Sequence, residues 1–223
     1  MISILCPTRG RPNNMRRLFE SVYSTADSKD IEIIFYIDAD DGPSIDMALE
    51  LGTSSIVGPR IVLSEMWNRC YEMSRGGILM HCGDDIIFRS DSWDTLVLKA
   101  FDEVSDKILL VYGRDGLQDE GLGTHTFMHR KWAETVGYFV PPYFSSDYND
   151  TWLNDVAIAI GRRKYIPEIY TEHMHPAAGK SEWDKTHQER IARHQADKVE
   201  ELYNSLIHER EADAAKLRAV MEN

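Results

Sequence analysis

The sequence predicts an α/β fold: a mostly parallel, Rossmann-like sheet flanked by helices and followed by a helical C-terminal extension. Apolar runs and helix-period segments alternate through about residue 113. The apolar runs are hydrophobic throughout and do not alternate with polar residues, which is typical of parallel strands buried on both faces. From residue 181 onward the chain is polar and helix-forming, which predicts the extension.

The predicted elements of the first half follow in strict alternation. After an opening strand, Met15, Leu18 and Val22 recur at helical spacing. Gly52 and the glycines at 76–77 mark the ends of the next two helices. We expect strands at 2–6, 31–37, 60–63, 78–82 and 107–113, and helices at 13–26, 43–52, 64–77 and 90–104.

The alternation loosens after residue 113. We expect a strand at 124–129, helices at 130–139 and 150–163, and a late strand at 164–176. Residues 1–178 then form the body and residues 179–223 the helical extension. The extension carries a narrow apolar stripe of Val199, Leu202, Leu206, Leu217, Val220 and Met221. This stripe predicts a helix docked on the body, with a homodimer contact or an acceptor-recruiting arm as alternatives.

Composition and charge narrow the function classes. The formal net charge is −12, which argues against nonspecific nucleic-acid binding because that usually needs a basic face. Three cysteines without metal-type spacing fit a reducing compartment. The first residues lack the basic region of a signal peptide, and no apolar run reaches the roughly 20 residues that span a bilayer. We therefore expect a cytoplasmic protein with no membrane span.

Polar side chains follow three of the predicted parallel strands. Thr8 and Arg9 follow the first strand, the acidic segment 38–41 follows the second, and Asp84 and Asp85 follow the fourth. Ligands of such folds bind outside the carboxyl ends of the strands, so these groups are expected to meet along one edge. Adjacent carboxylates with little basic compensation suit a hard divalent cation, Mg²⁺ or Mn²⁺. A turn or a helix cap is the alternative.

A histidine pair offers a further metal ligand. His173 and His175 lie two apart on the late strand, so both are expected to face the same side. Carboxylates plus one imidazole make a reasonable Mn²⁺ ligand set. One of the two is therefore a candidate metal ligand, and the alternative is a pair of surface or structural histidines.

Four segments in order resemble a known family. They are "SILCPTRGRP", "IEIIFYIDADDG", "LSEMWNRCYEMSRGGILMHCGDDIIF" and "YNDTWLNDVAIAIGRRKY". Together they resemble nucleotide-sugar glycosyltransferases of the GT-A fold, nearest the large inverting family with many polysaccharide and O-antigen transferases, and small members found in phages. The resemblance covers about residues 2–176. It implies a GT-A domain at 1–178, with a nucleotide-binding part at about 1–113 and an acceptor-side part at about 114–178.

The resemblance implies a donor-nucleotide site near the first two strands. Pro7, Thr8 and Arg9 lie where the family's first loop touches the nucleotide. Asp38 matches the carboxylate that hydrogen-bonds the uracil base. Because "DADDG" holds three acids where two are usual, Asp40 is a rival for that role.

The resemblance also implies donor and metal residues further along. Asn68 and Arg69 fall in a helix whose counterpart faces the donor pocket. Asp85 matches the direct metal ligand, and Asp84 would reach the ribose or the donor sugar. One histidine of the late pair matches the residue that completes the metal site in some members.

The catalytic base is expected on the acceptor side. An inverting transferase needs a group that takes the proton of the attacking hydroxyl. The family's acid pair at the start of a helix reads here as Asn149 and Asp150, so Asp150 is the first choice. Asp147 is the second, and an N-cap role for Asp150 is compatible with catalysis.

These observations predict a metal-dependent inverting glycosyltransferase that moves a sugar from a nucleoside-diphosphate sugar, most simply a UDP-sugar, to a hydroxyl acceptor, with Mn²⁺ or Mg²⁺ as cofactor. A glycan is the default acceptor, and a hydroxymethylated base of phage DNA is the rival. A nucleotidyltransferase and a catalytically silent nucleotide-binding module are the alternatives from other classes.

Overall fold

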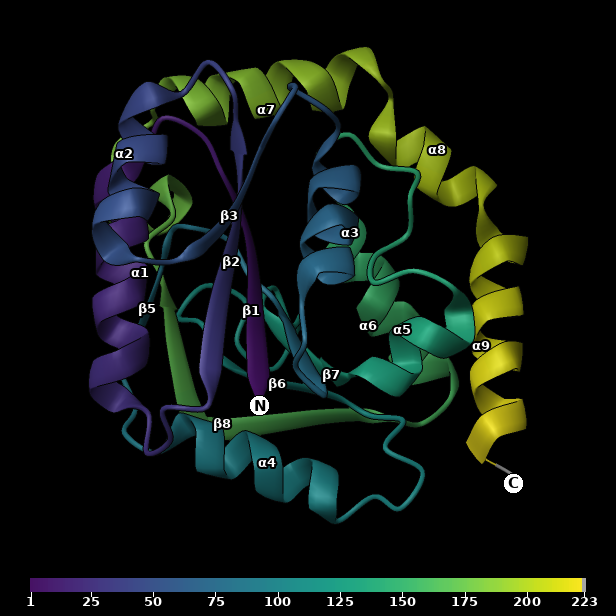
Figure 1. Cartoon of the computed structure of the whole chain (residues 1–223). Coiled ribbons are helices and arrows are strands. Elements are labelled where there is room, and N and C mark those ends of the chain that lie inside the picture. Colours follow the sequence, from purple (N-terminus) through teal and green to yellow (C-terminus); the bar gives the residue numbers. More distant parts are fainter. Residues whose placement is uncertain (222–223) are drawn as a thin grey trace.

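The computed structural model describes residues 1–221 and joins eight strands of that range in one sheet (Figure 1). Across the sheet the order is β3-β2-β1-β4-β7-β6-β8-β5. The strands are β1 (Ile2–Thr8), β2 (Ile31–Asp38), β3 (Ser54–Gly58), β4 (Ile78–His81), β5 (Ile86–Phe88), β6 (Leu110–Arg114), β7 (Thr126–His129) and β8 (Arg163–His173).

One half of the sheet is parallel. β1 pairs in parallel with β2 and β4, and β2 pairs in parallel with β3. Every residue of β1 is buried, which accounts for its uninterrupted apolar run, because helices cover both faces of the sheet here. The carboxyl ends of β1, β2 and β4 therefore share one edge, as predicted.

The other half of the sheet is mixed. β7 runs antiparallel to both β4 and β6, and β8 runs parallel to β6. The short β5 begins directly after Asp85 and pairs antiparallel with β8, with Ile86 opposite His173. This pairing brings the end of the late strand to the two adjacent aspartates.

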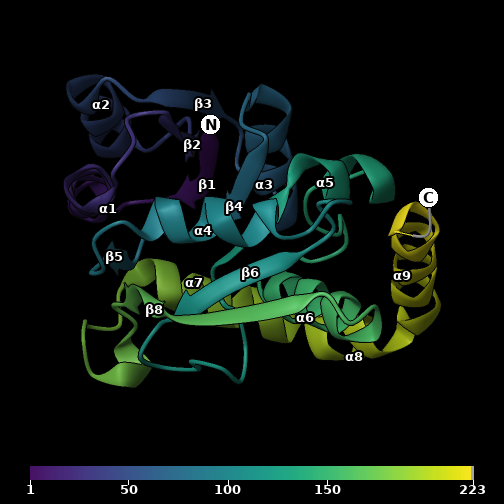
Figure 2. The same cartoon turned by 90° about the horizontal axis from the view of Figure 1, so that it is seen from below.

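Helices cover both faces of the sheet. On one face α1 (Pro12–Thr25), α2 (Gly42–Leu51) and α4 (Trp93–Asp102) share a hydrophobic core with the strands. Figure 2 shows α4 beside the pair β6 and β8. The other face is covered by α3 (Leu63–Met73), α5 (Arg130–Val136) and α6 (Asn149–Ala159).

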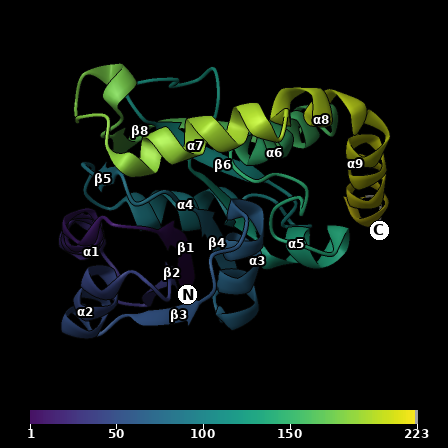
Figure 3. The ribbon, with the colours of Figure 1, turned by 90° about the horizontal axis from the view of Figure 1, so that it is seen from above.

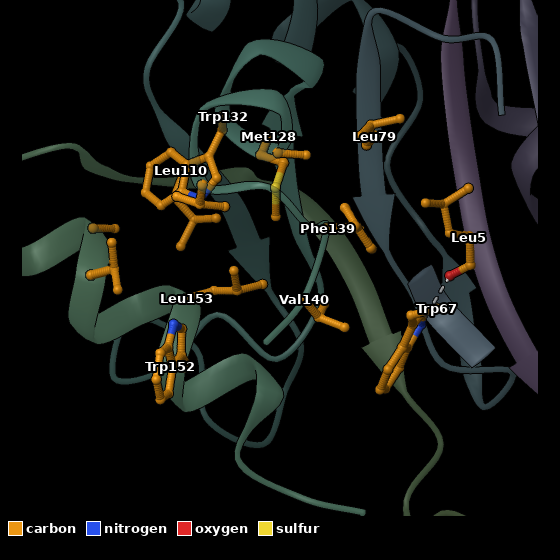
Figure 4. Packing of buried hydrophobic residues seen from close by; sticks show 14 of the residues in the cluster. Leu5, Trp67, Leu79, Leu110, Met128, Trp132, Phe139, Val140, Trp152 and Leu153 are labelled. Atoms are coloured by element: carbon orange, nitrogen blue, oxygen red, sulfur yellow. Dashed lines mark hydrogen bonds between the residues drawn. The ribbon is translucent and has the colours of Figure 1, made fainter. Parts of the chain in front are cut away.

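The core on the α3 side contains three buried tryptophans, Trp67, Trp132 and Trp152 (Figure 4). The indole Nε1 of Trp67 donates to the carbonyl oxygens of Leu5, at 3.2 Å, and Cys82, at 3.1 Å. A buried indole N–H needs such an acceptor. These bonds fix α3 against the ends of β1 and β4.

After β8 the chain forms a short 3₁₀ turn, η1 (Pro176–Ala178). Three helices follow it: α7 (Lys185–Ala196), α8 (Val199–Ser205) and α9 (Ile207–Met221). α7 crosses the edge where β1, β2 and β3 end, and Figure 3 looks down on it. α9 lies against α5 and α6. Val199 and Leu217 are fully buried in the α3-side core, so the stripe docks on the body of the same chain.

One strand differs from its predicted position, and one strand was not predicted. The expected strand at 60–63 is wrong, and β3 lies earlier, where Ser54 pairs with Ile34. Pro59 follows β3 directly, and the chain then leads into α3 at Leu63. The apolar residues after Asp85 were not predicted as a strand, because three residues are too few for a periodic signal. Within residues 1–221, none of the helices combines the length and apolar character of a membrane span.

Candidate functional site

A cavity of about 260 Å³ lies at the shared edge, between the ends of β1, β2 and β4 and helix α7. Nine residues expected from the sequence line it: Pro7, Thr8, Arg9, Asp38, Asp84, Asp85, Asp147, His173 and His175. Asp40, Asn68, Arg69 and Asp150 are not among its lining residues.

The two adjacent aspartates face different partners. The buried Asp84 carboxylate accepts hydrogen bonds from Thr8 Oγ1, at 2.7 Å, and Arg11 Nη1, at 2.9 Å. Asp85 instead faces His173, with 3.5 Å between Asp85 Oδ2 and His173 Nε2. Burial raises the pKa of Asp84, whereas at Asp85 the effect of burial is outweighed by His173, which lowers the pKa. The basic partner of Asp84 is Arg11, which the residues next to the two aspartates in the sequence do not reveal.

Asp85 belongs to a group of three side chains that fits a metal ion. Ligand atoms of Asp85, His125 and His173 all lie within 4.8 Å of one another. His125 Nδ1 accepts from the Gly83 N–H at 3.3 Å, and its buried Nε2 has no partner within residues 1–221. One carboxylate and two imidazoles suit a divalent cation such as Mn²⁺.

The two predicted histidine candidates separate in the structure. His173 joins the group with Asp85, whereas His175 lines the cavity outside it, and its Nδ1 accepts from the Ala177 N–H at 3.1 Å. The second imidazole of the group is His125. It lies far from the other two in sequence, so no local spacing signals it.

The three acids at the end of β2, Asp38, Asp40 and Asp41, have different partners. Asp38 is fully buried, and its Oδ2 accepts from Arg9 Nη1 at 2.7 Å. The same guanidinium also binds Asp40, which is exposed. Asp41 caps α2 at the Ser44 N–H. Asp38 Oδ1 is buried without a partner among the described residues, so it can accept a hydrogen bond from a ligand.

Asn68 and Arg69 lie outside the cavity for identifiable reasons. The Asn68 amide binds the main chain of the 139–140 segment, accepting from Phe139 N–H and donating to Val140 O, both at 2.9 Å. Arg69 lies on the outer side of α3 and pairs with Glu65 and Glu72. The structure therefore does not bring these two side chains to the other predicted donor residues.

The two candidate bases have different surroundings. Asp147 lines the cavity, and its carboxylate binds Arg190 Nη1 at 2.5 Å and His194 Nδ1 at 2.7 Å. Asp150 is half-buried in the first turn of α6 and accepts from the Thr151 N–H at 2.8 Å. Burial raises the pKa of Asp150 to about 6.

Helix α7 forms one wall of the cavity, through Thr186, His187, Glu189, Arg190 and Arg193. Arg11 joins this wall to the body by donating to both carboxylate oxygens of Asp184, at 2.7 and 2.9 Å. Thr186 Oγ1 donates to the Arg9 carbonyl oxygen at 3.0 Å. The sequence predicts this segment only as part of the helical extension, although His187, Arg190 and His194 recur at helical spacing, which could have indicated a functional face.

Comparisons with known proteins bear on the fold. No protein-family model matches the sequence, and no curated protein matches it. Among solved structures, the mannosyltransferase PcManGT from Pyrobaculum calidifontis, in complex with GDP-Man and Mn²⁺, is 12% identical with a TM-score of 0.64, covering 98% of this chain and 73% of that chain. This chain has the GT-A fold.

Two further structures show the same fold. Glucosyl-3-phosphoglycerate synthase from Mycobacterium tuberculosis, in complex with Mn²⁺, UDP and glucosyl-3-phosphoglycerate, is 13% identical with a TM-score of 0.62, over 78% of this chain and 72% of that chain. S. aureus TarS 1-349 in complex with UDP is 11% identical with a TM-score of 0.60, over 87% of this chain and 72% of that chain. These similarities show the fold of this chain. What the cavity can bind is argued from its own lining residues.

Proposed function

We propose that this chain is a metal-dependent glycosyltransferase that moves a sugar from a nucleoside diphosphate to a hydroxyl acceptor. One observation carries the proposal: Asp85 and His173 face each other in a cavity that also holds Asp38 and the loop after β1. Hard and borderline metal ligands thus lie beside groups suited to a nucleotide. The solved structures with Mn²⁺ and nucleotides have this fold and support the proposal.

In this proposal, residues at the ends of the parallel strands β1 and β2 bind the donor nucleotide. The free Oδ1 of Asp38 accepts an N–H of the base, and Thr8 and Arg9 lie beside it along the same cavity. Arg11 supplies a half-buried positive charge for the diphosphate. We propose UDP as the nucleotide.

Asp85, His173 and His125 would hold the cation, Mn²⁺ or Mg²⁺. When bound, such an ion neutralises the charge that develops on a departing diphosphate. The chain itself holds Asp85 facing His173, and it keeps Asp84 bound to Thr8 and Arg11. In this proposal Asp84 contacts the ribose or the donor sugar.

Asp150 is the proposed base, and transfer with inversion at the anomeric carbon is the proposed outcome. A base on the acceptor side takes the hydroxyl proton as the oxygen attacks the sugar. Asp150 does not line the cavity, but it lies in the first turn of α6, three residues after Asp147, which does. Burial raises the pKa of Asp150 to about 6, which suits proton uptake near neutral pH, whereas Asp147 is already bound to Arg190 and His194.

The proposal is tested by a thermal-shift screen of nucleoside diphosphates and their sugars, each with and without Mn²⁺. We expect a metal-dependent rise in Tm of several degrees with one nucleotide, because a ligand that binds the folded state stabilises it. Asp85→Asn should abolish the metal-dependent part of the rise. Asp102→Asn, at an exposed position on α4, is the matched control and should behave as the parent chain. If no nucleoside diphosphate stabilises the protein with Mn²⁺, the proposal is overturned.

A further inference from the structure

A second buried carboxylate, Asp115, lies behind His173. The distance from His173 Nε2 to Asp85 Oδ2 is 3.5 Å, and the distance from His173 Nδ1 to Asp115 Oδ2 is also 3.5 Å. The imidazole therefore lies between two carboxylates, one at each ring nitrogen. Nδ1 is buried and makes no hydrogen bond within residues 1–221, which leaves the Asp115 carboxylate as an acceptor at ion-pair distance.

Asp115 is held rigidly by a turn that follows β6. It is 2% exposed, and its Oδ1 accepts the N–H groups of Leu117, Gln118 and Asp119 at 2.8, 2.7 and 3.0 Å. Its Oδ2 accepts from Thr124 Oγ1 at 2.8 Å. Burial alone would raise the pKa of Asp115, but the nearby His173 and the N–H groups of the turn outweigh it and hold the pKa far below its usual range. The three N–H groups and the Thr124 hydroxyl thus hold the carboxylate in a fixed orientation as a hydrogen-bond acceptor.

The main chain adds a further contact between the same two residues. The His173 N–H donates to the Asp115 carbonyl oxygen at 2.8 Å. This bond joins the last residue of β8 to the residue after β6, two strands that run side by side. The position of the imidazole relative to Asp115 is therefore determined by backbone pairing as well as by the side chains.

We propose that Asp115 is a positioning residue for the metal site, acting through His173. By accepting the Nδ1 proton it would leave Nε2, which faces Asp85, as the nitrogen available to ligate a cation. A metal-binding imidazole must be unprotonated at the ligating nitrogen, and an acceptor at the other nitrogen sets that tautomer and the ring orientation. This inference rests on the proposed function.

The first test is Asp115→Asn, with Mn²⁺ affinity measured by electron paramagnetic resonance of the free ion. The amide oxygen can still accept the three N–H groups of the turn, but the amide nitrogen cannot accept the Nδ1 proton. We expect Mn²⁺ binding to weaken by about 10- to 100-fold, as is typical when the partner of a ligating histidine is removed. The Tm without metal should change little.

Asp119→Asn is the matched control. Asp119 Oδ1 holds the same turn by accepting the Asp115 and Gly116 N–H groups, but it makes no contact with His173. We expect this variant to bind Mn²⁺ as the parent chain does. Equal weakening in both variants would show that the turn matters and the carboxylate does not, which would overturn the inference.

A double-mutant cycle separates positioning from general structure. In a His173→Ala background, Asp115→Asn should have no further effect on Mn²⁺ affinity, because its effect passes through the imidazole. An undiminished effect would overturn the inference.

Nitrogen-15 histidine spectra of the unmodified chain with Mg²⁺ do not depend on any variant folding. We expect the His173 signal to show a proton on Nδ1, and a proton on Nε2 would overturn the inference. If the parent chain binds neither Mn²⁺ nor Mg²⁺, the proposed metal site fails together with the inference. If it binds the ion and Asp115→Asn binds equally well, only the inference fails.

Discussion

At the scale of single residues, neighbouring carboxylates have different chemistry because their partners differ. Asp84 is bound by Thr8 and Arg11, whereas Asp85 faces His173. Arg11 lies 73 positions before Asp84 in the sequence. The like charges of the pair are therefore compensated by tertiary contacts, and each aspartate is directed to a different part of the cavity.

Asp150→Asn should show a pH-dependent gain in stability. The pKa of Asp150 is raised from 3.8 to about 6, so its stabilising protonation is present below pH 3.8 and is lost as the pH rises through 6. The variant cannot ionise. Its Tm should exceed that of the parent chain at pH 8 by about 2–4 °C, equivalent to about 1 kcal/mol for a partly exposed group. The difference should vanish near pH 4, and thermal melts across this range measure it.

The same substitution tests the base assignment. Loss of a general base should lower kcat by about 10²–10⁴-fold, while donor binding stays unchanged. Asp147→Asn is the comparison variant, because Asp147 lies in the cavity but is bound to Arg190 and His194. A larger loss of kcat in Asp147→Asn than in Asp150→Asn would contradict the assignment to Asp150.

At the scale of elements, α7 is a wall of the cavity and carries an unpaired cation. Arg193 lines the cavity, and within residues 1–221 its guanidinium forms no ion pair, while its Nε is buried without a hydrogen-bond partner. Burial and the nearby Arg60 lower the pKa of Arg193. A half-buried guanidinium without a carboxylate partner is suited to an anionic ligand.

Arg193→Gln should weaken binding of the nucleoside diphosphate by about tenfold or more, since a charge-assisted hydrogen bond contributes about 1.5–3 kcal/mol. Binding of the uncharged nucleoside should be unaffected, and isothermal titration calorimetry can compare the two. Arg69→Gln provides the contrast, because Arg69 pairs with Glu65 and Glu72 outside the cavity. Weakening in Arg69→Gln alone would favour the donor role that the family resemblance implies for Arg69.

The docking of α9 depends on a buried carboxylate. Asp213 accepts hydrogen bonds from Tyr138 Oη and Trp152 Nε1. Asp213→Ala leaves both donors unpaired, so the free energy of unfolding should fall by about 2–4 kcal/mol in urea titrations. Glu211→Ala, at an exposed position on the same helix, should change it by less than about 1 kcal/mol. Equal effects would indicate that Asp213 does not anchor the helix.

At the scale of the whole molecule, the body and the extension share one core. Val199, Tyr203, Ala214 and Leu217 belong to the same hydrophobic cluster as Trp132 and Trp152. The C-terminal helices therefore contribute to the stability of the fold as well as to the cavity wall.

A chain ending at residue 178 should not fold stably. It would lose burial of at least Val199, Tyr203 and Leu217, each contributing about 1.5–3 kcal/mol, against a net stability of about 5–15 kcal/mol for a typical protein. Near-ultraviolet circular dichroism and a urea melt would test this. A cooperative melt for residues 1–178 would instead support the division into a domain and a separate extension that the sequence predicts.

The sequence by itself determined the α/β fold and the positions of most strands, because apolar periodicity is a local signal. It also predicted nine of the side chains that line the cavity, some from polar strand ends and others, such as Pro7 and Asp147, only from the family resemblance. Only the tertiary structure decided which side chains contact the predicted charged residues of the cavity. The partners lie far away in the sequence: Arg11 contacts Asp84, His125 lies near Asp85, and Asp115 lies beside His173. Because β8 pairs with both β5 and β6, His173 comes to lie between Asp85 and Asp115. The tertiary structure also showed that α7 forms a wall of the cavity. Its polar sequence alone predicts a solvent-exposed helix, because the sequence does not show which edge of the sheet the helix covers.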